Sequence, residues 1–348
     1  MSVQQFHLAV HPPGADGPGT GTPLERLTRL ARTAERGGFD FLLLPEGPPP
    51  GPEALTALGA LSAATTRLGL AAGLGPAAHQ PYELARRLAS LDHLSAGRAA
   101  WSVAVGPDAA REAAADGALR HGGLPPDADR HLHAAEFLRA ARTLWDSWAE
   151  DDVPADPAGG VFVRPGAGAF AHRGDHFDLD GRFTTPRAPQ GHPVVVRTVA
   201  SPQDLAPAAA DADVVLVPYT GLAEARALRQ DLADRLADHG RSPGDLRVLA
   251  TVAYALEDTP GATGLPVPQL VGTPRRIADA LTAYVRGGGS DGFLLTPHPA
   301  EDPLDAFVDR VVPLLRADGV HRAAYTGTTL RDHLGLAQAR RPSREASA

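Results

Sequence analysis

The feature that most constrains the fold is a repeated alternation of short apolar segments with longer segments of helical period. Each apolar segment is hydrophobic throughout and ends in glycine, proline or a polar residue. Continuous apolar strands that alternate with helices are typical of a parallel sheet covered by helices. The expected strands are Phe6–Val10, Phe39–Leu44, Arg67–Ala72, Ala99–Val105, Pro193–Val196, Asp213–Val217, Leu246–Ala253 and Asp291–Thr296.

Eight such units in 348 residues predict an α/β protein of the (β/α)₈ TIM-barrel class rather than an open sheet. The alternative is a doubly wound sheet. No G-x-G-x-x-G pattern follows the first strand, which weighs against a dinucleotide-binding domain of that kind. The expected helices are Pro23–Arg36, Glu53–Thr65, Pro81–Leu94, Arg130–Trp148, Leu222–His239, Thr273–Val285 and Pro303–Arg316.

Two segments interrupt the alternation. Residues 150–190, between the fourth helix and the fifth strand, are rich in Gly, Pro and Asp and predict a long insertion that contains a β-hairpin. Glu257–Leu270 is a shorter irregular segment. We expect one domain over residues 1–336, followed by a polar, disordered tail at 337–348.

Composition narrows the functional classes. The formal charge of -8 and the pI near 5.9 argue against nucleic acid or an anionic membrane as a partner. The absence of cysteine excludes disulfides, thiolate catalysis and cysteine-bound metals. The first residues lack the pattern of a signal peptide, and no apolar run is long enough to span a bilayer. We therefore expect a cytoplasmic protein.

Three side chains follow the first three strands, at the end of a barrel where active sites lie. His11 closes the first strand and is a candidate to orient substrate or to carry a proton. Glu46 closes the second strand and His79 follows the third. A loop histidine without a role and a helix-capping carboxylate are the alternative interpretations of His11 and Glu46.

The insertion contains several histidines near acidic residues. Their spacing matches no metal-binding pattern on one helix face, so we interpret them as solvated loop residues and predict no metal site. Trp145 and Trp148 are expected in the core. These histidines and acidic residues are His172, His176, His192, Asp175 and Asp178.

Several longer motifs resemble those of a known family. LDHLSAGRAAWSV, RHLHAAEFLRAARTLWDSW, GDHFDLDGRFTTPRAPQGHPVV and a C-terminal segment ending in TGTTLRDHLGL occur in this order. They are similar to the bacterial luciferase-like flavin-dependent monooxygenases, above all to the branch that contains the nitrilotriacetate, EDTA and dibenzothiophene-sulfone monooxygenases. The resemblance covers residues from about Phe6 to Leu336.

The resemblance implies a TIM barrel that binds reduced FMN and uses O₂ to oxidise a small organic substrate. It also implies a homodimer and a separate flavin reductase that supplies the reduced cofactor. Two other functions stay open. One is a non-catalytic barrel that acts as a partner subunit or binding protein. The other is an oxidoreductase that uses F420 in place of FMN.

The resemblance also assigns cofactor-binding positions. An Arg-Tyr pair that opens the fourth helix in the family corresponds to Arg130 and His131, and the second residue contacts the FMN phosphate. A Gln-Ala-Gly-x-Ser pattern after the fifth strand, which also holds phosphate, corresponds to residues 197–201. Here Arg197 is a possible compensating charge, Val199 replaces a glycine, and Ser201 is retained.

Two further polar patterns of the family are altered. The fourth strand usually ends Trp-Asn-x-Val-Thr, whereas this chain has Ser102 and Val105 at the positions of Asn and Thr. A Thr-x-Ser-Thr pattern after the third strand begins here with Gly73. We therefore expect Gly73, Ser102 and Val105 to face the flavin with fewer polar contacts than the family pattern provides.

Overall fold

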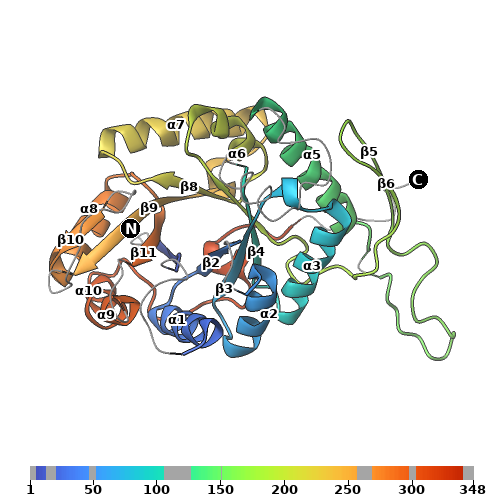
Figure 1. Cartoon of the computed structure of the whole chain (residues 1–348), viewed down its shortest axis with the longest axis horizontal. Coiled ribbons are helices and arrows are strands. Elements are labelled where there is room, and N and C mark those ends of the chain that lie inside the picture. The colour runs from blue at the N-terminus through green and yellow to red at the C-terminus, as the bar shows by residue number, and fades with distance from the viewer. Residues whose placement is uncertain are drawn as a thin grey trace.

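The computed structural model describes residues 5–12, 21–46, 52–105, 127–149, 151–256, 269–297 and 303–339. Within them, eight parallel strands form a ring that helices surround (Figure 1). The barrel strands are β1 (His7–Val10), β2 (Phe41–Pro45), β3 (Gly69–Leu74), β4 (Ala99–Val103), β7 (Val194–Thr198), β8 (Val214–Pro218), β9 (Arg247–Leu256) and β11 (Gly292–Pro297).

Parallel pairing closes the ring. β1 pairs with β2 and β11, and β9 joins β8 to β11. The predicted TIM barrel is therefore confirmed, and the doubly wound sheet is excluded because an open sheet has two free edges. A further short strand, β10 (Gln269–Gly272), pairs with the second half of β9 outside the ring. The sequence analysis had placed Gln269 and Leu270 in an irregular segment.

The helices begin and end at ordinary capping signals. Thr22 forms a capping box with Glu25 at the start of α1, and Gly38 ends the helix at φ +77°. The helices are α1 (Pro23–Gly37), α2 (Ala54–Ala64), α3 (Pro81–Leu94), α5 (Asp127–Trp145), α6 (Leu205–Asp211), α7 (Leu222–Asp238), α8 (Pro274–Arg286), α9 (Pro303–Arg310), α10 (Val312–Ala317) and α11 (Leu330–Leu334), with 3₁₀ turns η1 (Pro76–Ala78), η2 (Pro202–Asp204) and η3 (Pro243–Asp245).

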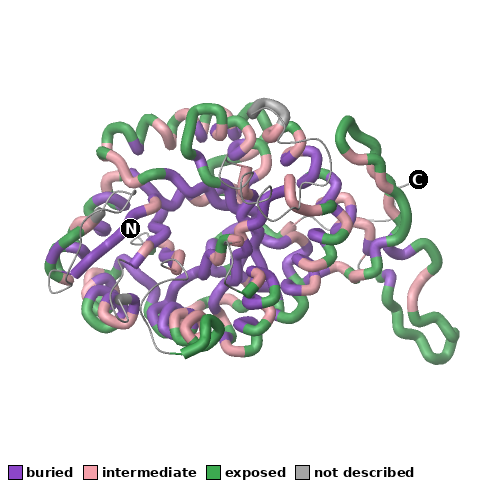
Figure 2. The backbone as a smooth tube through the Cα atoms, in the orientation of Figure 1, coloured by how far each residue is buried: buried purple, intermediate pink, exposed green. Residues whose placement is uncertain are grey.

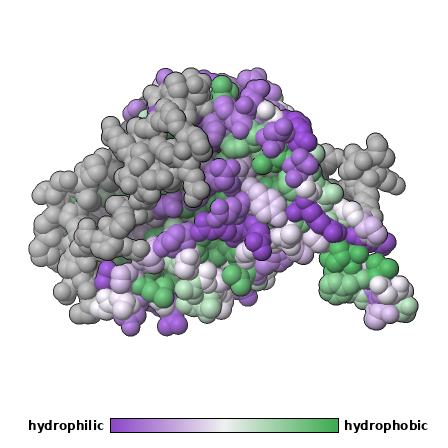
Figure 3. All heavy atoms as spheres, turned by 45° about the vertical axis from the view of Figure 1, so that its right-hand side comes forward, coloured by the Kyte–Doolittle hydropathy of each residue, from purple (hydrophilic) through white to green (hydrophobic). Residues whose placement is uncertain are grey.

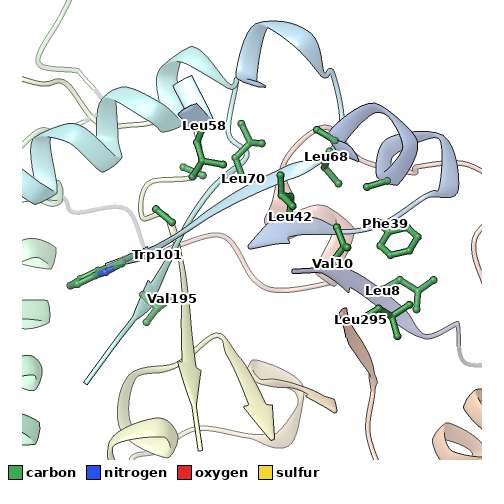
Figure 4. Close-up of a cluster of buried hydrophobic side chains, with 14 of the residues drawn as sticks. Leu8, Val10, Phe39, Leu42, Leu58, Leu68, Leu70, Trp101, Val195 and Leu295 are labelled. Carbon is green, nitrogen blue, oxygen red and sulfur yellow. The ribbon is translucent and has the colours of Figure 1, made fainter. Parts of the chain in front are cut away.

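Alternate residues of each strand face two different cores. Ala100, Val194 and Val196 belong to the cluster inside the ring, whereas Trp101 and Val195 belong to the larger cluster between strands and helices (Figure 4). The ring is buried almost throughout, and most exposed residues lie on the helices, in the connecting loops and in the insertion (Figure 2). Both faces of each strand are therefore buried, which explains its continuous apolar sequence.

The C-terminal segment closes the amino-terminal end of the barrel. Leu330 and Leu334 of α11 lie in the inner cluster, and Gly69 has no side chain because a Cβ there would lie 2.7 Å from Leu330. Arg331 pairs with Asp213 at 2.9 Å, and its backbone N–H donates to Gln190. The TGTTLRDHLGL motif thus covers the amino-terminal end of the barrel, which we call its floor, and is not part of the mouth at the opposite end. We call this segment, residues 326–336, the stopper.

A buried ion pair lies beside this stopper. Asp40 is fully buried and forms an ion pair with the guanidinium of Arg322 at 2.5 Å. Its carboxylate also accepts a hydrogen bond from the backbone N–H of Leu8 at 2.9 Å. Burial alone raises the pKa of Asp40, but Arg322, His7 and the Leu8 N–H outweigh it and lower the pKa to about 2. The carboxylate stays charged and ties β1 and β2 to the C-terminal segment.

The insertion between α5 and β7 contains the expected hairpin, formed by β5 (Ala169–Arg173) and β6 (Asp178–Arg182). The carboxylate of Glu136 on α5 accepts backbone N–H groups of Asp175, His176 and Phe177 at 2.8–3.1 Å. This clamp fixes the hairpin turn against α5. The loop before the hairpin, residues 151–168, projects from the barrel and exposes apolar side chains (Figures 1 and 3).

Other local expectations need correction. One expected helix at Pro303–Arg316 is divided into α9 and α10, because Pro313 lacks the N–H that would continue the helical hydrogen bonds. The short helices α6 and α11 were not predicted. Residues 257–268 of the second irregular segment and residues 340–348 of the tail lie outside the described residues. Within the described ranges, no helix combines the length and the apolar character of a membrane span.

Replacing Arg322 by alanine should lower the free energy of unfolding by about 3–5 kcal/mol, because it leaves the Asp40 carboxylate buried without its main partner. The matched control is Asp309→Ala, which removes an exposed pair with Arg36 and should cost less than about 1 kcal/mol. Urea unfolding of both variants measures the difference. Equal, small losses would contradict the importance of the buried pair.

His321 should make stability depend on pH. Burial lowers its pKa to about 4, against the opposing hydrogen bond to Gly37 O. The unfolded chain therefore binds a proton between about pH 6.5 and 4 that the folded chain does not, so stability falls as pH falls through this window. Between pH 7 and 5 the wild type should lose about 2 kcal/mol more than His321→Gln.

The control for this measurement is His239→Gln, which changes an exposed histidine at the end of α7. It should retain the full pH dependence of the wild type. Urea unfolding at pH 7 and pH 5 gives the comparison. If His321→Gln and His239→Gln lose the same stability as the wild type, burial of His321 does not govern this window.

Candidate active site at the barrel mouth

The carboxyl ends of the parallel strands meet at one end of the barrel, and strand register sets which residues are neighbours there. Pro45 pairs with Gly73, Gly73 with Ser102, and Ser102 with Val196. These four residues share the inward-facing side of their strands. They form one layer of the barrel just below its mouth.

Glu46 and His79, which were predicted separately, lie together. The Glu46 backbone N–H donates to Gly73 O at 2.8 Å, which fixes the carboxylate beside β3. His79 Nε2 lies 3.3 Å from Glu46 Oε2, and its side chain is mostly buried. A histidine paired with a carboxylate at a barrel mouth is a group that can hold or transfer a proton.

His11 follows β1 at the same end. Its backbone N–H donates to Leu295 O at 3.0 Å, so that its position is fixed by the neighbouring strand β11. Burial lowers the pKa of His11 below its ordinary value, although a hydrogen bond involving Pro12 opposes the shift. The imidazole is therefore mainly neutral at pH 7 and can accept a proton.

The three residues predicted to face the ring system of a flavin differ in orientation. Gly73 leaves room at the mouth, where a Cβ would lie 3.0 Å from Pro45 Cα. Ser102 is buried and faces inward with Ala100. Val105 packs on the outer core with Trp101 and Val103, on the opposite side of its chain from Ser102.

The positions expected to hold a phosphate are grouped, but an acidic side chain of this chain lies between them. Asp204 Oδ2 accepts the N–H of Ala200 at 3.1 Å, the N–H of Ser201 at 2.8 Å and the Ser201 hydroxyl at 2.9 Å. His131 Nε2 of α5 lies 3.6 Å from Asp204 Oδ1. The N–H groups of Ala200 and Ser201 and the Ser201 hydroxyl are thus directed at a carboxylate, with His131 beside it. A phosphate does not fit this arrangement.

Two other predicted phosphate positions point away from the mouth. Arg197 follows the outward side of β7 and forms two contacts with Asp211 at the end of α6, at 2.5 and 2.6 Å. Val199 is buried with Leu205 in the small core beneath α6. Arg130 lies in the first part of α5 and is partly buried. The structure therefore brings His131 and Ser201 together and directs Arg197 elsewhere.

The sequence analysis missed several residues of the mouth. Thr251 and Thr296 follow the inward side of β9 and β11, and Thr198 that of β7. In the sequence, the only indication that these threonines face the barrel interior is their position two residues after an inward-facing apolar residue. Asp204 had a clearer signal, because the spacing Ser201-x-x-Asp204 is that of a capping box.

The interpretation of the insertion histidines as solvated is wrong for two of them. His172 lies 3.4 Å from Glu136, and His192 lies 2.8 Å from Asp146; both histidines are mostly buried. His176 is exposed, as expected. In the described part of the chain, no group of three or more potential ligands is placed to hold a metal ion. Trp145 and Trp148 lie in the core, as predicted.

Comparison with known proteins gives relatives over nearly the full length. The sequence pattern of the luciferase-like monooxygenase family matches residues 1–264. Dibenzothiophene-sulfone monooxygenase of Rhodococcus erythropolis is 30% identical, over 88% of each chain. Component A of nitrilotriacetate monooxygenase of Aminobacter aminovorans is 29% identical, over 92% of each chain.

The solved structure of EDTA monooxygenase from Chelativorans sp. BNC1 has the same fold. It superimposes with a TM-score of 0.82 at 24% sequence identity, over 96% of this chain and 99% of that chain. The chain belongs to the luciferase-like monooxygenase family.

Proposed function

We propose that this protein is the oxygenase component of a flavin-dependent monooxygenase that oxidises a small organic substrate. The observation that carries the proposal is the Glu46–His79 pair at the mouth of a barrel of this family, with His11 at the same end. When bound, the reduced flavin supplies two electrons; one atom of O₂ enters the product and the other leaves as water. The protein binds the flavin, orients the substrate and transfers protons.

The proposal includes three roles for the mouth. His11, mainly neutral at pH 7, accepts a proton or orients substrate. The Glu46–His79 pair holds a proton near the reacting groups. Gly73 and Ser102 give a cofactor close access to the backbone of β3 and β4. These roles follow from position and chemistry together.

The likeness to component A of a nitrilotriacetate monooxygenase supports a separate reductase that supplies the reduced flavin. We extend the proposal to a cytoplasmic homodimer with one domain over residues 1–336. F420 is the alternative cofactor. A non-catalytic barrel that serves as a partner subunit is the alternative function. Titration under argon with reduced FMN, reduced riboflavin and F420 separates these possibilities, since the non-catalytic barrel binds none of them.

The test of activity uses ¹⁸O₂, a flavin reductase and a panel of organic sulfones, amines and alkanes. Mass spectrometry should show one labelled oxygen atom in a product that forms only with the protein, reductase and O₂ present. If the reduced flavin binds but no member of the panel is labelled, the panel is extended. If neither reduced flavin nor F420 binds, the monooxygenase proposal is wrong.

Glu46→Gln and His79→Ala should each lower kcat/KM by at least about 100-fold, as expected for loss of a positioned proton-transfer group. The affinity for reduced flavin should stay near that of the wild type. His93→Ala is the control, because His93 lies at the far end of α3 and the described hydrogen bond of its side chain is to Pro186 O. Unchanged activity in both mouth variants would remove the pair from the mechanism.

A further inference from the structure

The carboxylate of Asp204 lies among polar groups from two separate elements, the loop after β7 and helix α5. Ala200 and Ser201 contribute two backbone N–H groups and a hydroxyl from the loop after β7. His131 Nε2 of α5 lies 3.6 Å from the other carboxylate oxygen, which is ion-pair rather than hydrogen-bond distance. Among the described residues, the buried Nδ1 of His131 has no hydrogen-bond partner. Such a convergence is more than the local cap of a short turn, because α5 is distant in sequence.

A second turn of the same chain shows what the local cap alone looks like. Ser242 and Asp245 form an identical capping box, with Ser242 N and Oγ at 2.8 and 2.9 Å from Asp245 Oδ2. That box precedes β9 at the opposite end of the barrel. Neither an N–H of the preceding residue nor a histidine is recorded at the Asp245 carboxylate among the described contacts. The Thr329–Asp332 box of α11 does have the N–H of its preceding residue, Thr328, at Asp332 Oδ2. Among these three boxes, the approach of a histidine from a distant helix is therefore the feature that distinguishes Asp204.

Charge decides which ligand this arrangement accepts. A phosphate that used the donors of Ser201 and Ala200 would lie within a few ångströms of the Asp204 carboxylate, where like charges repel. Moving Asp204 aside would sacrifice three hydrogen bonds. Arg197, the strand residue that might have offset the added charge, is held by Asp211 on the other side of β7. The polar groups around Asp204 therefore disfavour a phosphorylated ligand.

We propose that Asp204 is a specificity-determining residue that selects a flavin without a phosphate, so that reduced riboflavin binds at least as tightly as reduced FMN. This inference rests on the proposed function, because it concerns which flavin enters the same mouth. Asp204 acts as an internal anion that satisfies the donors and leaves only the ring system and the ribityl chain to be bound.

The experiment measures dissociation constants of reduced FMN and reduced riboflavin under argon by fluorescence and calorimetry. Asp204→Asn keeps an oxygen that can cap Ser201 but removes the charge. It should shift the affinity ratio toward FMN by about tenfold or more, the size expected for a hydrogen bond to a charged group. Asp245→Asn, the matched control, should leave the ratio unchanged.

A second substitution tests the part played by His131. In the wild-type background, His131→Ala should leave the FMN-to-riboflavin ratio unchanged, because the imidazole faces Asp204. In the Asp204→Asn background, the same change should lower FMN affinity, because the imidazole is then available to the phosphate. Thermal unfolding of each variant verifies that the fold is retained.

Each outcome is decisive. If the wild type binds reduced FMN measurably more tightly than reduced riboflavin, the phosphate contributes to binding despite Asp204, and the inference is wrong although the proposed function stands. If Asp204→Asn and Asp245→Asn behave alike, Asp204 does not set the preference. If neither flavin binds to any variant, the proposed function and the inference are both wrong.

Discussion

The fastening of the C-terminal segment beneath the barrel is the constraint on which the rest of the structure depends. Arg322 holds Asp40 between β1 and β2, and Arg331 holds Asp213 before β8, so two buried ion pairs connect opposite sides of the ring. Leu330 then fills the space that Gly69 leaves open. With its floor closed by side chains from residues 320–336, the ring can vary at its mouth without losing its shape.

The sequence was sufficient for the barrel because each strand is buried on both faces, and this leaves an unmistakable apolar pattern. It was also sufficient to place Glu46 and His79 at one end, since strand ends of a parallel barrel share an end. It was insufficient for pairs that only the closed ring brings together. Arg197 looked available for phosphate, but strand alternation directs it to Asp211. Asp204 was not among the predicted site residues, because only the folded chain brings His131 of α5 to within 3.6 Å of it.

Two of the motifs quoted for the resemblance contain residues that stabilise the fold. TGTTLRDHLGL forms the stopper, and the tryptophans of LWDSW are buried with their ring N–H groups donating to Ala85 O and Phe183 O. Ser102 at the mouth also lies within one of the quoted motifs, LDHLSAGRAAWSV. The quoted motifs therefore contain residues of the core as well as residues at the barrel mouth.

Helix α5 links two parts of the molecule that are described separately above. Its first turns carry His131 beside Asp204, and one to two turns later Glu136 holds the hairpin through three backbone N–H groups. A helix is stiff over this distance, so α5 holds the hairpin turn and His131 in a fixed relative position. The turn of the inserted hairpin and the loop that carries Asp204 are therefore both attached to one helix, α5, within two helical turns of each other.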